Sequence, residues 1–407
     1  MNRRPSRTTR RSRTGIAGTA LAALLAGAAA CGPSGSDDDT ADGDAGRSFT
    51  VAAAGDILIH PELTEQAGKD AKETGKGVAG LDFDPIMAGI KPVISKADLA
   101  ICHFEPVASA SPKGPFESFP AFIVPPQITT TIKNIGYDTC STASNHSLDH
   151  GATGVTNTLN ALDKAGVKHT GSARSAAEAQ KPNILDVKGV KVAQLSFAGG
   201  FNGHTIPENK PWLVNQTSIR AIKAAEQRAR KAGADVVILS IHWGREHQPT
   251  PNAVQLDLAR RIAKQTGINL VIGHHAHVVQ PMEKIGDTWV AYGLGNQIAR
   301  HEVPSGLSEE GVTGWFEFTE RGGTWDVRAK YVPTFIDIPP DPDENGAVPK
   351  GSVKDHRLVD VAAALRDGDG LSAQQRARYR LAFERTEGTL LNRGAGQDGL
   401  EPLNPLP

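Results

Sequence analysis

Short apolar runs, most of them ending at a glycine or a polar side chain, alternate along this chain with stretches of helical periodicity. Apolar runs of about four to eight residues are typical of buried strands, whereas apolar positions three and four residues apart predict a helix. Strand-bearing segments are expected at residues 48–55, 97–105, 136–146, 184–197, 234–241 and 269–272. Helices are expected at residues 151–166, 217–232 and 253–265. This alternation predicts an α/β fold with a largely parallel sheet.

The pattern changes after residue 297. Two β-like runs within residues 314–335 flank Arg321-Gly322-Gly323 and predict a hairpin that completes a second sheet. Residues 338–350 are rich in proline, aspartate and glycine and predict a loop, and a helix is expected at about 372–385. We expect one domain over residues 48–337, with residues 338–407 packing on it as loop, helix and tail.

The first residues have the pattern of an export signal. Six arginines lie between Arg3 and Arg13, and an apolar run over residues 16–30 ends in three alanines before Cys31. This order of charged, apolar and small residues is typical of a secretory signal, and a cysteine at its end resembles a lipoprotein signal. Residues 1–31 are therefore predicted to be a lipoprotein-type signal peptide and residues 32–47 a flexible linker. Cleavage without lipidation, and either the Sec or the twin-arginine route, stay open. The expected location is the outer face of the cytoplasmic membrane.

The charge balance of the chain bears on the class of partner that it binds. Forty-four Lys and Arg balance 45 Asp and Glu, so no basic excess favours nucleic acid as a partner.

Cys102 and Cys140 lie on strands expected to be neighbours in an oxidising compartment. They form either a disulfide or two small buried thiols, and the sequence leaves both possibilities open.

Metal-competent side chains follow five of the predicted strands. Parallel strands gather their carboxyl ends at one edge of a sheet, which is where ligands bind in α/β proteins. The side chains are Asp56, Glu105, Asn145 with His146, His242, and His275 with His277. Five such coincidences predict a metal site. Imidazole, carboxylate and amide ligands together favour Mn, Fe or Zn over Mg or Ca.

Several motifs in order resemble one family. They are GDILIH (residues 55–60), CHFEPVAS (102–109), SNHSLDHG (144–151), HWGREH (242–247), GHHAHVVQP (273–281) and YGLGN (292–296). Over about residues 49–297 the chain resembles the CapA, or PGA_cap, family of bacterial capsule synthesis proteins, a branch of the calcineurin-like metallophosphoesterases. The resemblance implies a metallo-dependent phosphatase-like layered β-sandwich flanked by helices. It also implies a role with poly-γ-glutamate or another capsule polymer.

The resemblance also assigns roles to single residues. Asp56, Glu105, Asn145, His242, His275 and His277 would be metal ligands, for two divalent ions, and His146 would be the catalytic general acid. His60 lies four residues after Asp56 instead of two, which puts its role as a ligand in question. Ser147 stands where the superfamily has an acid, and Asp149 is a possible substitute. His274 could take the place of His275 if the loop is shifted by one residue.

Two classes of function follow. One is an exported metal-dependent hydrolase acting on a phosphoester or an envelope polymer. The other is a non-hydrolytic envelope factor that binds, guides or anchors an anionic capsule polymer, with membrane-bound synthesis or export proteins as further partners. Metal content combined with turnover of phosphoesters separates them. A solute-binding lipoprotein, suggested by the signal alone, would hold no tightly bound metal.

Overall fold

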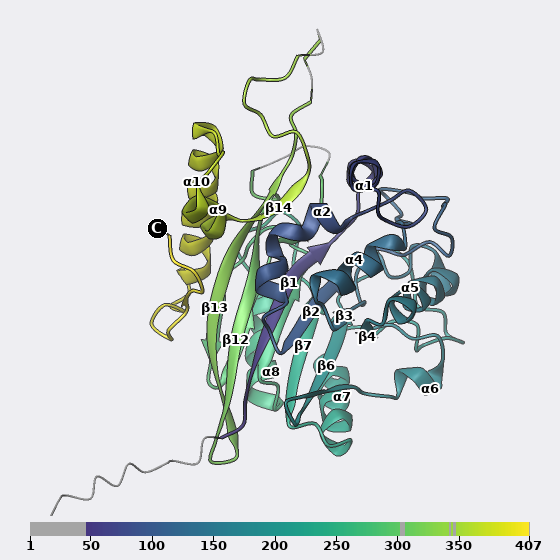
Figure 1. Ribbon diagram of the computed structural model, residues 1–407. Helices are drawn as coiled ribbons and strands as arrows, with labels where there is room; N and C mark the ends of the chain where they lie inside the picture. The colour runs from purple at the N-terminus through teal and green to yellow at the C-terminus, as the bar shows by residue number, and fades with distance from the viewer. Residues whose placement is uncertain (1–45, 302–305, 342, 345–346, 407) are drawn as a thin grey trace, which may run out of the picture. The chain divides into compact units, whose positions relative to one another are not determined.

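Two packed β-sheets with helices on their outer faces make up the chain from residue 46 onward in a computed structural model (Figure 1). The structure describes residues 46–301, 306–341, 343–344 and 347–406. The predicted signal peptide and nearly all of the predicted linker lie outside the described residues. The predicted layered β-sandwich flanked by helices is confirmed.

The larger sheet contains the first strand of the fold. Its order is β14-β13-β12-β1-β2-β3-β4, with β11 beside β1 and β15 beside β13. The strands are β1 (Ser48–Ile57), β2 (Leu99–Phe104), β3 (Thr139–Ser141), β4 (Lys168–Thr170), β11 (Asn296–Ile298), β12 (Glu310–Arg321), β13 (Thr324–Asp337), β14 (Arg357–Asp360) and β15 (Glu401–Pro402). Strands β1 to β4 are parallel, whereas β12 to β14 continue the sheet in antiparallel order.

The smaller sheet has the order β5-β6-β7-β8-β10-β9. Its strands are β5 (Asn183–Val187), β6 (Val190–Ala198), β7 (Val236–His242), β8 (Leu270–His274), β9 (Met282–Ile285) and β10 (Thr288–Ala291). Within the strand-bearing segment expected at residues 184–197, β5 and β6 form a hairpin that turns at Lys188-Gly189. Strands β6, β7, β8 and β10 run parallel to one another, so the carboxyl ends of β7 and β8 lie at one edge.

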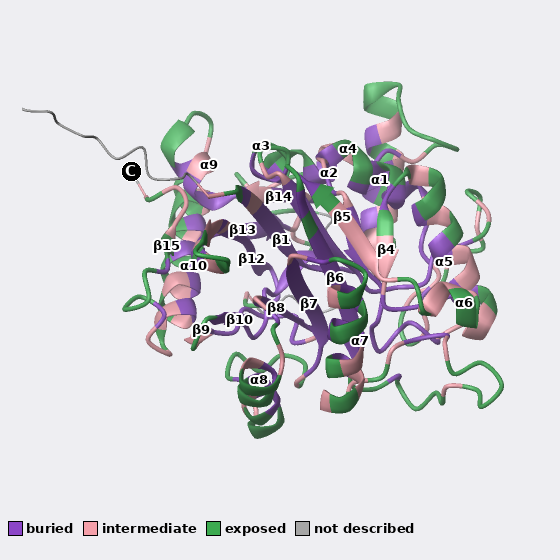
Figure 2. Cartoon of the chain, turned by 90° about the horizontal axis from the view of Figure 1, so that it is seen from below, coloured by how far each residue is buried: buried purple, intermediate pink, exposed green. Residues whose placement is uncertain are grey.

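The helices connect the strands on the outside. They are α1 (Pro61–Thr74), α2 (Asp84–Met87), η1 (Ala88–Ile90), α3 (Lys91–Ile94), α4 (Gln127–Ile135), α5 (Gly151–Ala165), α6 (Ala176–Ala179), α7 (Ile219–Lys231), α8 (Ala253–Gln265), α9 (Val361–Asp367) and α10 (Ala373–Leu391). Figure 2 shows that α7 and α8 expose one side and bury the other. Among the described residues, no helix combines the length and the apolar character that crossing a membrane requires.

The alternation of side chains along β1 places apolar residues in two clusters, one on each face of the larger sheet. In β1, Val51 and Ala53 face the smaller sheet and pack in a cluster with Ile238 of β7. Ala52 and Ala54 point the other way, into the cluster beneath α1, α2 and α4. A strand buried on both faces carries apolar side chains at consecutive positions, which explains the continuous apolar runs seen in the sequence.

One expectation about topology is corrected by the structure. A largely parallel sheet was expected, but both sheets are mixed because antiparallel strands flank their parallel centres. The expected hairpin is formed by β12 and β13, and it pairs through β12 with β1, so it extends the sheet that carries Asp56. The long helix near the C-terminus also extends to Leu391, beyond the expected end.

Helix α10 packs on β13 through an apolar cluster reinforced by polar contacts. Phe335, Tyr379 and Phe383 are buried together in it. The Tyr379 hydroxyl donates to Asp337 Oδ2 at 2.7 Å, and Arg378 Nη1 lies 2.7 Å from an oxygen of the buried Glu310. The C-terminal segment therefore covers one side of the larger sheet.

Cys102 and Cys140 form a disulfide between β2 and β3. The two residues are directly paired in the parallel ladder, with their Cα atoms 4.4 Å apart. The bridge stands one residue before His103 on β2 and Ser141 on β3, and so ties together the strand ends that lead into the candidate site.

We expect the double variant Cys102→Ala/Cys140→Ala to lose about 2–4 kcal/mol of unfolding free energy. The bridge closes a loop with a sequence separation of 38 residues, and opening such a loop raises the entropy of the unfolded chain. Denaturant unfolding of parent and variant measures the difference. Thiol counting on unfolded, unreduced parent protein provides the check, because free thiols at both positions would contradict the pairing.

Candidate metal site

Strand pairing brings the predicted site residues together from both sheets. Asp56 on β1 is paired with His103 on β2 and with Asn296 on β11, and His103 is paired with Ser141 on β3. In the smaller sheet, His242 at the end of β7 is paired with His274 at the end of β8. The carboxyl ends of parallel strands from two facing sheets therefore converge on one place.

Close backbone approaches make this convergence possible. A Cβ on Gly55 would lie 2.2 Å from the carbonyl oxygen of Gly295, and a Cβ on Gly273 would lie 2.0 Å from that of Tyr292. Each glycine directly precedes a site residue, so a larger side chain here would push the strand ends apart. His275 and His277 have φ of +89° and +54°, a region that costs energy for residues other than glycine and that clusters at functional sites.

One half of the site is formed by Asp56, His277 and Glu105. His277 Nδ1 lies 3.3 Å from Asp56 Oδ2, and its Nε2 lies 3.6 Å from Glu105 Oε1. Burial disfavours the charged forms of His277 and Asp56. Even so, Glu105 and Asp56 raise the pKa of His277 to about 10. The pKa of Asp56 is held well below its ordinary value, against burial, by hydrogen bonds from His274 and His277. A buried anionic environment that attracts protons also attracts metal cations.

The other half contains Asn145, His242 and His275. His242 Nε2 lies 2.9 Å from Asn145 Oδ1, and the rings of His242 and His275 are 4.6 Å apart. Asn145 Nδ2 donates to Asn202 Oδ1 at 3.2 Å, which turns Oδ1 toward His242. Burial lowers the pKa of His275 to about 4 and, with the positive charges of neighbouring histidines, keeps the pKa of His242 well below its ordinary value. Both rings are therefore neutral and can act as ligands.

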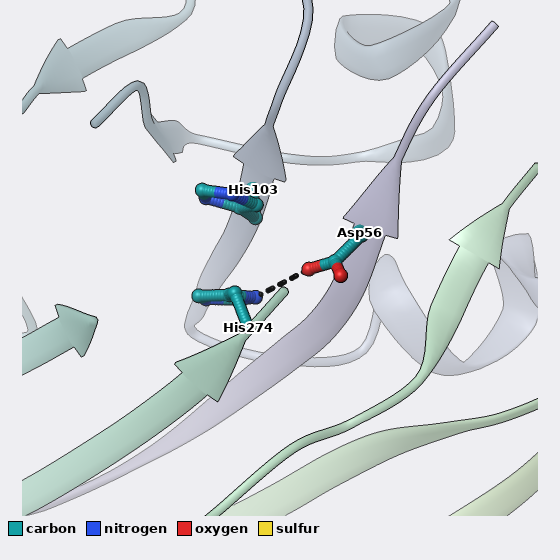
Figure 3. A group of neighbouring side chains, drawn as sticks. All are labelled: Asp56, His103 and His274. Carbon is teal, nitrogen blue, oxygen red and sulfur yellow. Dashed lines mark hydrogen bonds and ion pairs between the residues drawn. The ribbon is translucent and has the colours of Figure 1, made fainter. Parts of the chain in front are cut away.

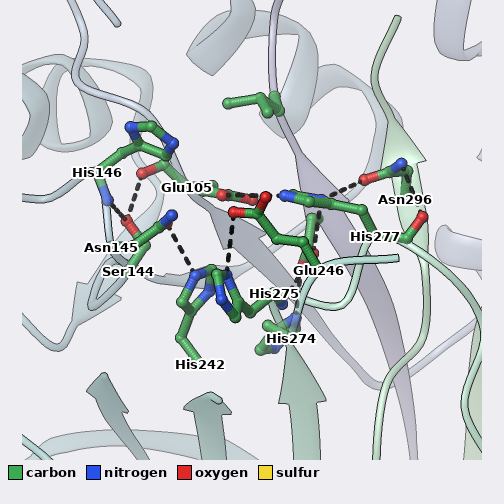
Figure 4. A network of polar contacts seen from close by, with 12 residues as sticks. Glu105, Ser144, Asn145, His146, His242, Glu246, His274, His275, His277 and Asn296 are labelled. Atoms are coloured by element: carbon green, nitrogen blue, oxygen red, sulfur yellow. Dashed lines mark hydrogen bonds and ion pairs between the residues drawn. The ribbon is translucent and has the colours of Figure 1, made fainter. Parts of the chain in front are cut away.

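Glu105 joins the two halves (Figure 4). Its side chain has no solvent exposure, and neither carboxylate oxygen has a hydrogen-bond partner among the described residues. Burial raises its pKa to about 7, although the charge of His277 opposes the shift. A buried carboxylate without partners costs several kcal/mol unless a cation compensates it. The residues present fit a divalent metal on this ground.

Asn296 fixes the orientation of His277, a role that the sequence does not indicate. Its Nδ2 donates to the carbonyl oxygens of Ser308 (2.8 Å) and His277 (3.2 Å), so its Oδ1 must be the acceptor for His277 Nδ1 at 2.9 Å. When His277 is neutral, as a metal ligand must be, its proton is therefore on Nδ1 and its lone pair is on Nε2, the nitrogen nearer Glu105. A single asparagine in the YGLGN segment could not indicate this contact before the strands were placed.

His146 forms a pair with Asp149. Its Nδ1 lies 2.7 Å from Asp149 Oδ2, which also accepts the backbone N–H of Phe122 at 2.8 Å. Burial disfavours the imidazolium ion, but Asp149 and the charge of Glu105 outweigh burial and raise the pKa of His146. Asp149 thus supplies the acid that Ser147 does not.

Trp243 and Glu246 follow His242 in the segment HWGREH. Trp243 is buried and donates to the Tyr292 carbonyl at 2.9 Å, whereas Glu246 is exposed, lies 4.0 Å from His275 Nδ1 and converges with His275 and His277. His60 accepts the Arg300 backbone N–H at 3.1 Å and belongs to none of the converging groups found among the described residues.

His274 does not replace His275. Its Nδ1 lies 2.9 Å from Asp56 Oδ1, and its ring stacks on His103 at 4.0 Å and 15° (Figure 3). Imidazole lone pairs lie in the ring plane, so stacked rings cannot aim their nitrogens at one ion. Asp56, His103 and His274 are close together, but they support the site rather than form a second one.

These features define a two-sheet α/β protein whose strand ends carry a buried cluster of imidazole, carboxylate and amide groups suited to a divalent metal. The profile of the family Bacterial capsule synthesis protein PGA_cap matches residues 50–301, so the chain belongs to that family.

Two curated relatives are similar to this chain. The PGA biosynthesis protein CapA of Bacillus subtilis is 27% identical over 254 residues, which cover 61% of this chain and 62% of the relative. The Capsule biosynthesis protein CapA of Bacillus anthracis is 24% identical over 254 residues, which cover 61% of this chain and 59% of the relative. The chain thus spans about three fifths of the length of these curated relatives.

One solved structure of similar arrangement is the calcineurin-like phosphoesterase YfkN from Bacillus subtilis. It has 15% sequence identity and a TM-score of 0.38, covering 83% of this chain and 97% of that one. A likeness this distant has no bearing on activity.

Proposed function

We propose that this chain is an exported CapA-like protein of capsule, and specifically poly-γ-glutamate, biosynthesis that acts as a metal-dependent hydrolase on a phosphoester or an envelope polymer. The observation that carries the proposal is Glu105, a fully buried carboxylate without hydrogen-bond partners among the described residues that converges with the imidazoles of His242 and His277. Family membership supports the polymer context, and the donor set supports metal chemistry.

Two divalent ions, of Mn, Fe or Zn, would be held by the six proposed ligands. Asp56 and His277 lie on one side of Glu105, and Asn145, His242 and His275 lie on the other. When bound, such ions polarise phosphoryl or carbonyl oxygens and lower the pKa of a water molecule. Asn296 and Asn202 orient His277 and Asn145 for this task, because the Oδ1 of each accepts a hydrogen bond from the proposed ligand.

The proton of the reaction would be handled by His146. Asp149 holds the proton on Nδ1, so Nε2 is the nitrogen that gives a proton to, or takes one from, a reacting group. The raised pKa of His146 means that the imidazolium form persists to a higher pH than in an ordinary histidine. That property suits a general acid at neutral pH.

A test of activity separates hydrolysis from binding. Purified protein loaded with Mn or Zn is assayed on generic phosphomonoesters and phosphodiesters and on poly-γ-glutamate. We expect turnover that a chelator abolishes and added metal restores. Bound metal without turnover of any of these would contradict the hydrolase and leave a non-hydrolytic factor that binds, guides or anchors the polymer.

Export and anchoring are part of the proposal. The charged and apolar start, the small residues before Cys31 and the disulfide between Cys102 and Cys140 all suit a chain outside the reducing cytoplasm. We expect a lipid on Cys31 to hold the chain at the outer face of the membrane, near membrane-bound synthesis or export proteins.

Replacing Cys31 by alanine should release the protein from the membrane fraction, because the acyl chains would be lost. Fractionation with a salt wash measures the distribution of parent and variant. A Cys31→Ala protein that stays with the membrane after the wash would show that no lipid on this residue holds it.

A further inference from the structure

His103 is a buried histidine at the end of β2 that the proposed ligand set does not use. Its ring has no solvent exposure. Its Nε2 lies 3.0 Å from Nδ1 of the proposed ligand His242, and its Nδ1 lies 2.8 Å from the hydroxyl of Ser141. Both ring nitrogens thus have hydrogen-bond partners.

The three side chains form a linear chain of hydrogen bonds that ends at the site. It runs from Ser141 through His103 to His242, and His242 Nε2 faces Asn145 Oδ1 at 2.9 Å. A neutral imidazole donates from one nitrogen and accepts at the other, so fixing the direction of one bond fixes the direction of all the others.

In the first direction each of the three hydrogen-bonded side chains donates toward the site. The Ser141 hydroxyl donates to His103 Nδ1, His103 Nε2–H donates to His242 Nδ1, and His242 Nε2–H donates to Asn145 Oδ1. Every polar group is paired, and this arrangement suits the metal-free protein. His242 then has no lone pair facing the site.

In the second direction the chain donates away from the site. A metal ligand needs a lone pair on Nε2, so the proton of His242 must be on Nδ1 and be donated to His103 Nε2. His103 then donates from Nδ1 to the Ser141 oxygen. Ser141 still has an acceptor for its own hydrogen, because the carbonyl oxygen of Cys102 lies 3.3 Å from its Oγ. Both directions keep the same number of protons. In the second direction His242 Nε2 and Asn145 Oδ1 lose the hydrogen bond between them, and both would offer lone pairs to an ion.

We propose that His103 is a positioning residue that lets His242 change between these two tautomers and so offer Nε2 to a metal ion. The proposal rests on the metal site put forward above and names a residue that prepares it. Breaking the hydrogen bond between His103 and His242 would leave His242 Nδ1–H buried without an acceptor in the metal-bound state, which would weaken metal binding.

Neighbouring residues hold these hydrogen-bonded side chains in place. His103 and Ser141 are paired in the β2–β3 ladder, one residue beyond the disulfide that joins these strands. His274 stacks on the face of the His103 ring and prevents it from turning away. Asn202 fixes the Asn145 amide so that its oxygen, not its nitrogen, faces His242.

Two substitutions at His103 separate hydrogen bonding from packing. In His103→Gln the amide can accept from His242 Nδ1 with its oxygen and donate to Ser141 with its nitrogen, whereas His103→Leu fills similar space and does neither. We expect the leucine variant to bind zinc about 10- to 100-fold more weakly than the parent, and the glutamine variant to bind nearly as well as the parent. His356→Leu is the matched control, because His356 is buried but its ring nitrogens have no hydrogen-bond partner among the described residues.

A second measurement needs no variant that might fold poorly. Nitrogen NMR of ¹⁵N-histidine-labelled parent protein, with His103→Gln used to assign the signal, reports which nitrogen of His103 carries the proton. We expect Nε2–H without metal and Nδ1–H with zinc. The same tautomer in both states, or zinc affinity in His103→Leu equal to that of the parent, would overturn the role of His103. Parent protein that binds no zinc would instead overturn the metal site itself.

Discussion

Replacing Glu105 by glutamine is expected to weaken divalent-metal binding by at least about 100-fold and, at the same time, to make the metal-free protein more stable. The loss follows because Glu105 is the carboxylate between the two halves of the site. The gain follows because both of its oxygens are buried without hydrogen-bond partners among the described residues, and the ion pair with His277 Nε2 at 3.6 Å offsets the cost of burying its charge only in part, since burial still raises the pKa of Glu105. A neutral amide removes that charge, and we expect about 1–3 kcal/mol of added unfolding free energy at pH 8.

Titration with zinc and denaturant unfolding without metal measure the two effects on Glu105→Gln. Glu309→Gln is the matched control, because Glu309 is also buried and has an oxygen without a hydrogen-bond partner, yet it belongs to none of the converging groups of described residues. It should leave metal binding unchanged. A Glu105→Gln protein that binds metal as tightly as the parent would show that this carboxylate is not a ligand.

Replacing His146 by alanine is expected to reduce turnover about 10²- to 10⁴-fold while leaving metal content unchanged. His146 is adjacent to the proposed ligand Asn145, but its ring is held by Asp149 and not by the cluster. The loss is that of a general acid, and the pH profile of the parent should lose its alkaline limb in the variant. Steady-state kinetics measures the turnover, and metal analysis of the same preparations measures the metal content.

His169→Ala is the control for this variant. His169 Nε2 lies 3.1 Å from Asp163 Oδ1 in a comparable histidine–aspartate contact away from the cluster, so turnover should stay near that of the parent. If His146→Ala loses metal as completely as His242→Ala does, His146 is a ligand and the assigned role is wrong.

The strands that carry the proposed ligands could be predicted because their signal is local. The apolar runs that end at Asp56, His242 and His274 are buried on both faces, and burial on both faces produces apolar runs in the sequence. The residue types at their ends then pointed to metal chemistry.

Helix α1 shows why other elements were not predicted. Its buried face includes Leu63 and Ala67, but also Gln66 and Asp70. Asp70 is buried against Arg357, which lies 2.8 Å away and nearly 290 positions later in the chain. A helix that buries polar residues against distant partners has a weak apolar period, so the sequence alone gave little reason to expect it.

The orientation of the side chains within the site could not be predicted from the sequence, for a similar reason. The contact of His277 with Asn296 and that of His242 with His103 depend on strand pairing and on which nitrogen carries a proton. Neither spacing nor residue type determines these. The same holds for Asp149, which contacts His146 because the turn after Asn145 folds back on itself.

We expect the strand ends of the two sheets to hold divalent metal around Glu105, and the metal content of the purified protein tests this. Purified parent protein is loaded with zinc, freed of unbound ions and analysed for metal per chain, with Glu105→Gln treated in the same way. About two ions per parent chain and a large loss in the variant are expected. Parent protein that retains no stoichiometric metal after loading would show that Glu105 and its neighbours do not form a metal site.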